Sequence, residues 1–378
     1  MKLGDLCGSE TERLTVATDQ LIDYIDISSV SNESKSIIGK QTLKSREAPS
    51  RAQRILKSND ILVSTVRPNL NAVAVYDGSF KNLAVASTGF CVLRCKPGVN
   101  HRFIFNICKS RAFIKALVEQ ATGASYPAVN EKIIRAFEFP DVTYECQEEV
   151  AARLDTLQRI IDLRKQQLRE LDDLIKARFV EMFGDININD KGWDVQPLGE
   201  LCTIVRGGSP RPIEQFLGGD IPWIKIGDAT EGESIYLNST KEHIIQEGIK
   251  KSRLVKEGSL IFANCGVSLG FARIITFDGC IHDGWLAMED IDSSLNKIFL
   301  LQTLNQMTDH FRKIAPAGTQ PNLNTAIMKS YKQIIPPMKL QNDFIDFVSQ
   351  IDKSKVVAQK AIDEAKLLLD SLMQKYFG

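Results

Sequence analysis

The chain has 378 residues, of which 43% are hydrophobic and 25% are charged, and its basic and acidic side chains are equal in number. This composition is typical of a globular protein with room for two cores, and it excludes an intrinsically disordered chain. No apolar run approaches the roughly 20 residues that span a bilayer. The start, MKLGDLCGSE, also lacks the apolar stretch of a signal peptide, so we expect a cytoplasmic protein.

The first part of the chain predicts a small sheet followed by a helix. Its strand-like runs are YIDIS, NDILVSTVRPNLNAVAVYDG and ASTGFCVLRC, and a helix is expected from about 103 to 120. Cys91 and Cys95 lie on the third run, where we interpret them as buried thiols. The eight cysteines show no CxxC spacing and none of the four histidines lies close to a cysteine pair, so we expect no metal and no cofactor in this chain.

A long helix is predicted next. From Val150 the apolar residues are spaced alternately by four and three, typical of heptad positions a and d, with interruptions at Arg164 and Arg178. The run contains no internal Gly or Pro and ends at Phe183 and Gly184. Its apolar positions are Val150, Leu154, Leu157, Ile161, Leu168, Leu171, Ile175 and Met182.

The second part of the chain predicts the same order of elements. LGELCTIV indicates a short helix or the start of a strand, GGSPRP a loop, IPWIKIGDA a strand and HIIQEGIKKSRLV (243–255) a helix. GSLIFANCGVSLGFARII and GCIHDGWLAM predict strands and turns, with Trp223 and Trp285 packed in the core, and a helix is expected over 297–315. Because helices and strands do not alternate regularly, we expect α+β domains with a small twisted sheet rather than doubly wound ones.

The two parts are a tandem duplication. Pro127 and Pro321 are 194 residues apart, as are Gln147 and Gln341 and the two Phe-Gly pairs that end the helical runs. LGDLC also matches LGELC, and YIDIS matches WIKIG. A period this long indicates a repeated domain with its helix rather than one turn of a solenoid. The second heptad run keeps the same frame, with apolar residues at Phe344, Val348, Ile351, Ala358, Ile362, Ala365, Leu369, Leu372 and Tyr376.

A single helix of this kind would leave its apolar seam in water, so we expect the two helices to pack against each other. An antiparallel pair would place the globular copies at opposite ends of a rod, each helix reaching roughly 50 Å at about 1.5 Å per residue. Arg164, Arg178 and Lys355 either fix the register or mark where a partner protein completes the seam; an ordinary dimerising coiled coil is the alternative. The predicted domains are 1–143, a first globular copy; 144–184, a central helix; 185–338, a second copy; and 339–378, a C-terminal helix.

Two similar stretches, TGASYPAVN (122–130) and AGTQPNLN (317–324), each precede a short helical run. The final asparagines, Asn130 and Asn324, are predicted to cap these helices by accepting hydrogen bonds from free backbone N–H groups. We interpret the stretches as positioning elements, and a ligand contact by Thr319, Gln320 and Asn322 is the alternative.

The sequence shows no catalytic constellation. The GxxxxGK[ST] phosphate loop, the Asn-Pro-Pro-aromatic methyltransferase motif, GxSxG and paired histidines at metal-ligand spacing are all absent. Glu364 and Lys366 form an ExK triplet, but it lies on the second heptad run without a suitably placed Pro-Asp. We therefore expect a chain that binds rather than catalyses.

Charge is distributed unevenly along the chain. Residues 1–143 carry five more basic than acidic side chains, and residues 184–338 carry three fewer. Neither part is basic enough to hold nucleic acid by charge alone. A run broken only by Glu47 is either a solvated face or a phosphate contact; its members are Lys40, Lys44, Arg46, Arg51, Arg54 and Lys57.

The order of these motifs resembles the specificity subunit of type I restriction-modification enzymes. The resemblance rests on LGELCTIVRGGSPRP, IPWIKIGDA, SRLVKEGSLIFA, AGTQPNLN, the QIIPP stop and a long heptad helix, in a duplicated chain. It covers essentially the whole chain and is looser in the first half, where the GxP loop has no clear counterpart and FEFPD replaces the double proline. The order of the motifs and the 194-residue repeat are more specific than any single motif.

The resemblance implies that each globular copy is a target recognition domain that reads one half of a split double-stranded DNA target, while the helices set the gap. Two readers on one face of B-DNA lie about one helical turn, some 34 to 36 Å, apart, which a helix of this length can bridge. A duplicated chain has two near-equivalent surfaces related by a pseudo-two-fold axis. The family's partners are two methyltransferase subunits, which bring S-adenosylmethionine and flip adenine, and restriction and translocase subunits that use ATP and Mg.

Loop residues with the chemistry of base and phosphate recognition are the candidate DNA contacts. Arg or Lys suits guanine, Asn or Gln suits adenine, and phosphates take Lys, Arg and Ser; for each residue, a turn former or a solvated loop is the alternative. The candidates of the first copy are Lys44, Arg46, Arg51, Arg67, Asn69 and Asn71. The candidates of the second copy are Arg206, Ser209, Arg211, Lys225, Asn264 and Ser268.

Two other functional classes stay open on the sequence alone. A coiled-coil scaffold or adapter without DNA affinity would self-associate and would not be retained on DNA. A nuclease would cleave DNA with a metal ion and would lose that activity when Glu364 or Lys366 is changed.

Overall fold

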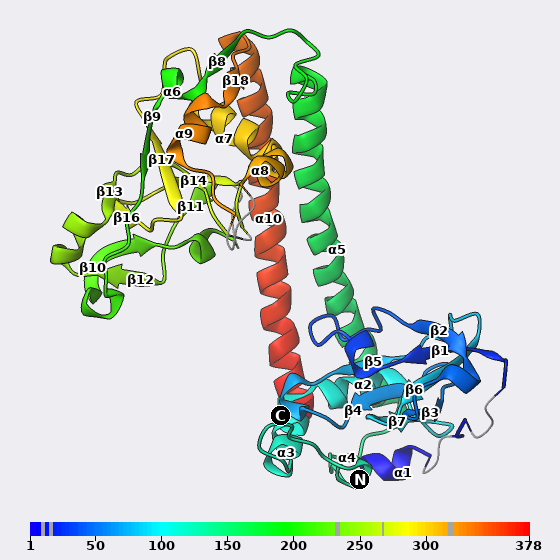
Figure 1. The fold of residues 1–378 in the computed structure, drawn as a ribbon. Coiled ribbons are helices and arrows are strands. Elements are labelled where there is room, and N and C mark those ends of the chain that lie inside the picture. Colours follow the sequence, from blue (N-terminus) through cyan, green and yellow to red (C-terminus); the bar gives the residue numbers. More distant parts are fainter. Residues whose placement is uncertain (9–11, 15–17, 231–234, 267, 317–320) are drawn as a thin grey trace. The chain divides into compact units, whose positions relative to one another are not determined.

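The computed structural model describes residues 1–8, 12–14, 18–230, 235–266, 268–316 and 321–378. Its internal contacts divide the chain into two compact units, the first comprising Met1–Gln166 with Ala358–Gly378 and the second Gln167–Val357 (Figure 1). Each unit contains one globular copy and a section of each long helix, α5 (Tyr144–Phe183) and α10 (Met338–Phe377). The end of the chain therefore completes the first unit.

The first unit contains two small sheets. In one, β1 pairs antiparallel with β2 and parallel with β6, and β3 pairs with the other edge of β6. In the other, β4 lies between β5 and β7, and all pairs are antiparallel. The strands are β1 (Leu21–Ile25), β2 (Gln41–Lys44), β3 (Ala52–Ile55), β4 (Ile61–Ser64), β5 (Val73–Val75), β6 (Leu83–Ser87) and β7 (Phe90–Leu93).

The helix predicted over 103–120 is two helices that meet at Ser110. The hydroxyl of Ser110 accepts a hydrogen bond from the N–H of Phe113 at 3.1 Å, so this serine caps a new helix instead of continuing the first. The first of the pair contacts β4 and β5. The helices of this unit outside α5 and α10 are α1 (Leu3–Leu6), α2 (His101–Lys109), α3 (Arg111–Glu119) and α4 (Glu131–Arg135), with 3-10 turns η1 (Ile27–Ser29), η2 (Ser45–Glu47) and η3 (Pro68–Leu70).

The second unit repeats this pairing. β10 pairs antiparallel with β12 and parallel with β16, with β13 beyond, as β1 does with β2, β6 and β3. β14 lies between β15 and β17, and here β11 and β9 extend the sheet while β8 and β18 form a separate pair. The strands are β8 (Val195–Pro197), β9 (Thr203–Arg206), β10 (Leu217–Ile224), β11 (Tyr236–Leu237), β12 (Glu242–Ile244), β13 (Arg253–Val255), β14 (Leu260–Ala263), β15 (Ala272–Ile275), β16 (Gly279–Ile281), β17 (Trp285–Glu289) and β18 (Lys332–Ile334).

The helix predicted over 243–255 is wrong. This segment forms β12, the 3-10 turn η6 (Gln246–Lys251) and β13, because its β-branched residues are needed in the sheet: Ile244 pairs with Ile221 and is fully buried. Gly248, within 3-10 turn η6, also weakens a continuous helix. The other helices of this unit are α6 (Leu198–Leu201), α7 (Lys297–Gln306), α8 (Thr308–Ile314) and α9 (Thr325–Ser330), with 3-10 turns η4 (Ile213–Gln215) and η5 (Ile226–Ala229).

The helix predicted over 297–315 is likewise divided, into α7 and α8, at Met307. The side chain of Thr308 donates to the carbonyl oxygens of Gly270 and Asn305, at 2.6 and 2.8 Å, and so ties this junction to the neighbouring loop. Trp223 and Trp285 are 3% and 0% exposed, which confirms the prediction that both pack in the core.

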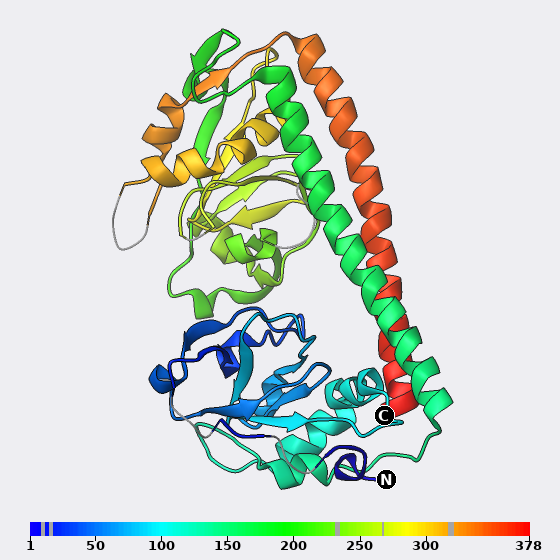
Figure 2. The same cartoon turned by 90° about the vertical axis from the view of Figure 1, so that its right-hand side faces the viewer.

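Within each unit α5 and α10 run antiparallel. In the first unit the beginning of α5 lies beside the end of α10, where Val150 and Leu154 share a buried cluster with Phe377 (Figure 2). In the second unit the end of α5 meets the beginning of α10, where the rings of Phe179 and Phe344 are 5.5 Å apart. Lys355 forms an ion pair with Asp172 across this second seam, which favours a register-fixing role for that lysine. The predicted fold class, tandem α+β copies with long antiparallel helices, is confirmed.

A buried glutamine joins each globular copy to the start of its long helix. Gln147 accepts a hydrogen bond from the N–H of Asn100, and Gln341 accepts one from the N–H of Asn296, at 3.1 and 2.8 Å. Both asparagines are the N-caps of the equivalent helices α2 and α7. The amide of each glutamine also donates to backbone carbonyl oxygens beside the start of its own long helix. The duplication therefore preserves two side-chain hydrogen bonds of this joint in both copies.

No helix in the described part of the chain has both the length and the apolar character needed to cross a membrane.

Candidate nucleic-acid interface

Three segments of the first copy converge on one surface: the turn after β4 (65–71), the turn between β6 and β7 (87–89), and the stretch 122–130. The N–H of Arg67 donates to the carbonyl oxygen of Pro127 at 2.7 Å, and the N–H of Val129 donates to that of Thr65 at 2.8 Å. Thr65 in turn donates its N–H to the carbonyl oxygen of Gly89 at 2.9 Å. The loop between β4 and β5 is therefore held between the other two segments.

The second copy builds the same frame. Gly266 donates its N–H to Pro321, Leu323 donates to Asn264, and Asn264 donates to Gly284, at 3.2, 2.8 and 2.9 Å. These bonds match those of the first copy one for one, so 264–270 is the counterpart of 65–71, and 282–284 that of 87–89. We call these three-segment surfaces the first and second loop surfaces.

This equivalence explains why the chain contains the duplicated stretch: each copy of it pairs with the loop that follows the central strand. Asn130 and Asn324 then cap α4 and α9, accepting from Ile133 at 3.0 Å and from Ile327 at 2.9 Å, as predicted. The suggested ligand contacts Thr319 and Gln320 lie outside the described residues, and Asn322 is partly buried.

The candidates selected in the second copy come together around the turn 282–284. Arg206 donates to the carbonyl oxygen of Asp283 at 3.0 Å, Ser209 donates to its carboxylate at 2.8 Å, and a guanidinium nitrogen of Arg211 lies 4.0 Å from that carboxylate. Lys225 follows Ile224, whose carbonyl oxygen accepts from the N–H of residue 282, and Asn264 and Ser268 lie on the adjoining loop. Lys225 itself forms an ion pair with Glu242.

His282 holds this turn in shape as a neutral side chain. Burial lowers its pKa, and the positive charges of Lys225, Arg211 and Arg206 act in the same direction, against Asp283. Nδ1 therefore accepts from the N–H of Gly284 at 2.9 Å, while Nε2 lies 2.9 Å from the Asp283 carboxylate and donates to it.

The candidates of the first copy form two groups. Arg67 and Asn69 are exposed on the first loop surface, and Arg51 touches it through its carbonyl oxygen, which accepts from the N–H of Thr88 at 2.8 Å. Lys44 and Arg46 lie at the end of β2 and in η2, where both approach the carboxylate of Asp19. The remaining members of the predicted basic run are paired with acidic residues of other segments; these pairs are Lys40 with Asp23, Arg54 with Glu131, and Lys57 with Glu12.

Two of the selected asparagines are buried. The amide of Asn71 donates to the carbonyl oxygen of Cys108 at 2.9 Å, and that of Asn264 donates to Leu323 at 3.1 Å. They are 6% and 0% exposed. In this conformation their side chains shape the loops instead of facing solvent.

Three residues of these surfaces were not selected from the sequence: Tyr126, His282 and Asp283. Tyr126 is 67% exposed, and the guanidinium carbon of Arg67 lies 4.5 Å from the centre of its ring. The Asp-Gly pair between two strand-like runs was a turn signal that could have drawn attention to Asp283. Nothing in the local sequence pairs Arg67 with a tyrosine 59 residues later.

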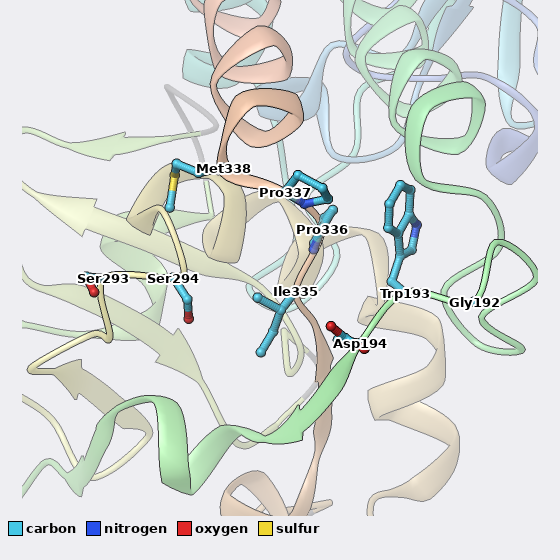
Figure 3. A pocket seen from close by; sticks show the side chains of 9 residues that line it. All are labelled: Gly192, Trp193, Asp194, Ser293, Ser294, Ile335, Pro336, Pro337 and Met338. Atoms are coloured by element: carbon cyan, nitrogen blue, oxygen red, sulfur yellow. The ribbon is translucent and has the colours of Figure 1, made fainter.

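A cavity of about 470 Å³ in the second unit has none of these candidates among its lining residues (Figure 3). Its walls come from the segment before β8, from the turn before α7, and from the double proline that precedes α10. Since no basic side chain lines it, we do not assign nucleic-acid binding to it. The lining residues are Gly192, Trp193, Asp194, Ser293, Ser294, Ile335, Pro336, Pro337 and Met338.

The described ranges contain no group of three or more His, Cys, Asp or Glu side chains that could hold a metal ion. Cys91 is fully buried on β7, as predicted, whereas Cys95 lies beyond that strand, is only partly buried, and pairs with Cys7 in an isolated β-bridge. Both cysteines are free thiols.

The family model of the type I restriction modification DNA specificity domain matches residues 1–173 and 190–366. The type I restriction enzyme MjaIX specificity subunit of Methanocaldococcus jannaschii is 24% identical over 361 residues, which cover 89% of this chain and 81% of that protein. The HindI specificity subunit of Haemophilus influenzae is 19% identical over 375 residues, covering 78% of this chain and 80% of that protein.

Solved structures share the fold. A chain from a study of complex assembly and conformational transition of the type I R-M system aligns with a TM-score of 0.63 and 22% identity, covering 100% of this chain and 96% of its own. The type I restriction-modification system S subunit from M. genitalium aligns with a TM-score of 0.56 and 15% identity, covering 100% and 95%.

The chain therefore belongs to the family of type I restriction modification DNA specificity domains, and it carries that domain twice. It is a DNA-sequence specificity subunit, which is a non-catalytic component of its system and holds no cofactor of its own. A scaffold without DNA affinity is not favoured by these matches.

Proposed function

We propose that each copy reads one half of a bipartite double-stranded DNA target through its loop surface, and that the long helices set a fixed non-specific gap between the halves. In this proposal residues 1–143 and 185–338 are the two readers, and 144–184 and 339–378 are the spacers.

The observation that carries the proposal is the contrast between a constant frame and variable side chains. The backbone hydrogen bonds of the two loop surfaces match one for one, yet the residues they present differ: Asn69 stands opposite Ser268, and Arg67 opposite Gly266. Recognition of two different base sequences by one fold requires this combination, since phosphate contacts position a protein and side chains at base edges specify the sequence.

The selected residues take different roles according to their exposure. The exposed arginines Arg46, Arg51, Arg67, Arg206 and Arg211 suit guanine edges or phosphates, and Asn69 suits adenine. Lys44, Lys225, Ser209 and Ser268 are partly buried and suit phosphates, which would replace the carboxylates that now pair with three of them. Asn71 and Asn264 keep the loops in shape.

The partners follow from the same proposal. A chain with two equivalent helix joints offers two similar surfaces and would take two methyltransferase subunits, which would supply S-adenosylmethionine. Restriction and translocase subunits with ATP and Mg would join them, and the complex would work on DNA in the cytoplasm. The matched joints at Gln147 and Gln341 support two equivalent docking positions.

The test is to co-express the chain with its methyltransferase partner and to sequence the methylated adenines of the host DNA. We expect one split motif with a fixed gap. Replacing residues 185–338 by those of a relative should change one half of the motif, and replacing residues 1–143 should change the other.

Matched point variants refine the test. Asn69→Ala and Ser268→Ala alter equivalent positions of the two loop surfaces. Asn69→Ala should relax only the first half of the motif, whereas Ser268→Ala, which would remove a phosphate contact, should weaken binding without changing the motif. A complex that forms and methylates without any sequence motif, or a domain exchange that changes both halves at once, would contradict the proposal.

A further inference from the structure

The exposed pair of Arg67 and Tyr126 stands out on the first loop surface. Tyr126 belongs to the duplicated stretch, and its ring is 67% exposed although no core requires it there. The guanidinium carbon of Arg67 lies 4.5 Å from the centre of that ring. The two residues are also held together by the main chain, through the hydrogen bond from Arg67 to Pro127.

The backbone of Arg67 adopts a conformation that favours glycine. Its φ is 50°, in the left-handed region, which costs a residue with a Cβ roughly 1 kcal/mol. The second copy makes the equivalent turn with Gly266, at a φ of 76°. At the other end of the turn, Asn71 at 48° stands opposite Gly270 at 101°. The turn itself therefore does not need the arginine side chain.

The contact with Tyr126 uses none of the hydrogen-bond donors of Arg67. The guanidinium carbon of Arg67 lies over the ring of Tyr126, and the five N–H donors of a guanidinium lie in its own plane. Within the described ranges we find no hydrogen bond or ion pair of this guanidinium to another side chain or to the backbone. The contact with Tyr126 restricts this side chain before any ligand arrives, so less side-chain freedom is lost on binding.

Two parallel donors in a fixed plane fit the O6 and N7 acceptors of guanine in the major groove, and an arginine on guanine is the commonest specific contact of this kind. We propose that Arg67, held by Tyr126, reads a guanine in the half of the target bound by the first unit. This inference rests on the proposed function and adds one base to it. Tyr126 is a positioning residue, and the second unit, with Gly266, lacks this contact.

The test uses the complex with its methyltransferase partner and compares binding to duplexes that carry G·C or another base pair at each position of the half-target. For Arg67→Ala and Arg67→Gly we expect the preference for G·C at one position to fall about 10- to 100-fold, with the other half unchanged. Arg67→Gly introduces the residue of the second copy, so it should fold at least as stably as the original while losing the preference.

Variants of the tyrosine separate positioning from folding. Tyr126→Phe keeps the aromatic ring beside Arg67 and should keep the preference for guanine, whereas Tyr126→Ala should lower that preference without changing the thermal unfolding temperature. Lys57→Ala removes an exposed positive charge elsewhere on the first unit and is the matched control; it should leave the recognised motif unchanged.

The outcomes are distinguishable. If Arg67→Ala weakens binding to all sequences alike and lowers the salt dependence by about one ion, Arg67 contacts a phosphate and the inference is overturned. If the original chain gives a split motif and Arg67→Ala leaves it intact, only this inference fails. If the original chain gives no motif, the proposed function fails and this inference with it.

Discussion

The two copies of the domain differ in the side chains that their loop surfaces expose, but both are joined to their long helices in the same way. At the joints the duplication is nearly exact in chemistry: Gln147 and Gln341 make equivalent bonds to Asn100 and Asn296. At the loop surfaces only the backbone frame is kept, while the exposed side chains differ. This pattern is expected where two domains are attached to their helices in the same way but recognise different DNA sequences.

The copies also differ in how their ends are closed. Phe183 ends the first long helix and is fully buried in the second unit, where its ring meets those of Trp193, Phe299 and Phe344. Its counterpart Phe377 ends the second helix and is 9% exposed in the first unit, against Phe103. The last phenylalanine of each long helix therefore packs into the core of the unit in which that helix ends. The phenylalanine in the second unit is the more completely buried of the two.

The largest expected effect follows from that difference. Phe183→Ala removes a ring from a closely packed aromatic cluster and should lower the free energy of unfolding of the second unit by about 3 to 5 kcal/mol. Phe377→Ala should cost the first unit roughly 2 kcal/mol, because that residue is 9% exposed where Phe183 is fully buried, and because it lies in the last helical turn.

The three tryptophans of the chain all lie in the second unit, so their fluorescence during urea unfolding reports on that unit. Phe183→Ala should shift the fluorescence transition, and Phe377→Ala should shift mainly the circular dichroism signal. Val180→Ala, at a side chain that is 55% exposed, is the control. If the fluorescence transition moves equally in both variants, the two phenylalanines do not stabilise their units independently.

The joints predict a smaller difference. The side chain of Gln341 makes three hydrogen bonds, accepting from Asn296 and donating to Ser294 and Pro336, whereas the side chain of Gln147 makes two, with Asn100 and Val142. Since a buried group left without its partner costs about 1 to 3 kcal/mol, Gln341→Ala should destabilise by about 2 to 3 kcal/mol and Gln147→Ala by somewhat less.

Unfolding of both glutamine variants by urea measures these costs, with Asn342→Ala as an exposed neighbour that should cost little. Equal costs would mean that the additional bond of Gln341 adds nothing to the joint. If neither variant lowers the free energy of unfolding, the glutamines do not hold the globular copies to their long helices.

The sequence was sufficient to predict the features that repeat within one chain. The 194-residue offset, the heptad positions and the two asparagine caps are local or periodic signals, and they required no knowledge of contacts. The segment 243–255 was mispredicted because the pairing of Ile244 with β10 overrides its local helical pattern. The cluster at Asp283 joins residues 74 and 77 positions apart, which spacing alone does not reveal.

A pH-dependent difference between the copies arises at Asp23. Burial raises the pKa of this fully buried carboxyl, but hydrogen bonds from Lys40, Thr42 and Asn82 outweigh it and bring the pKa down from 3.8 to about 2. The equivalent position of the second copy is Pro222, which has no carboxylate.

Because the folded pKa lies below the unfolded one, the stabilisation is fully present above about pH 4 and is lost as pH falls through 2. About 2 kcal/mol of the first unit's stability should disappear over that window. Asp23→Asn should remove this contribution at neutral pH and flatten the dependence, measured by circular dichroism during urea unfolding at several acidic pH values. A dependence that stays equally steep in the variant would assign it to other carboxylates.

The smallest expected effect concerns the two caps, which should behave alike. Asn130→Ala and Asn324→Ala each remove one bond to a backbone N–H, at 3.0 and 2.9 Å, and each should cost about 1 kcal/mol. Replacement by Asp or Ser should restore most of that stability, since both can accept the same bond. If the duplicated stretches only position the loops, neither alanine variant should change the methylated motif, although both residues end a segment of a loop surface. If either variant changes the motif, the stretch itself takes part in recognising DNA. Sequence recognition would then not depend on the variable loop side chains alone.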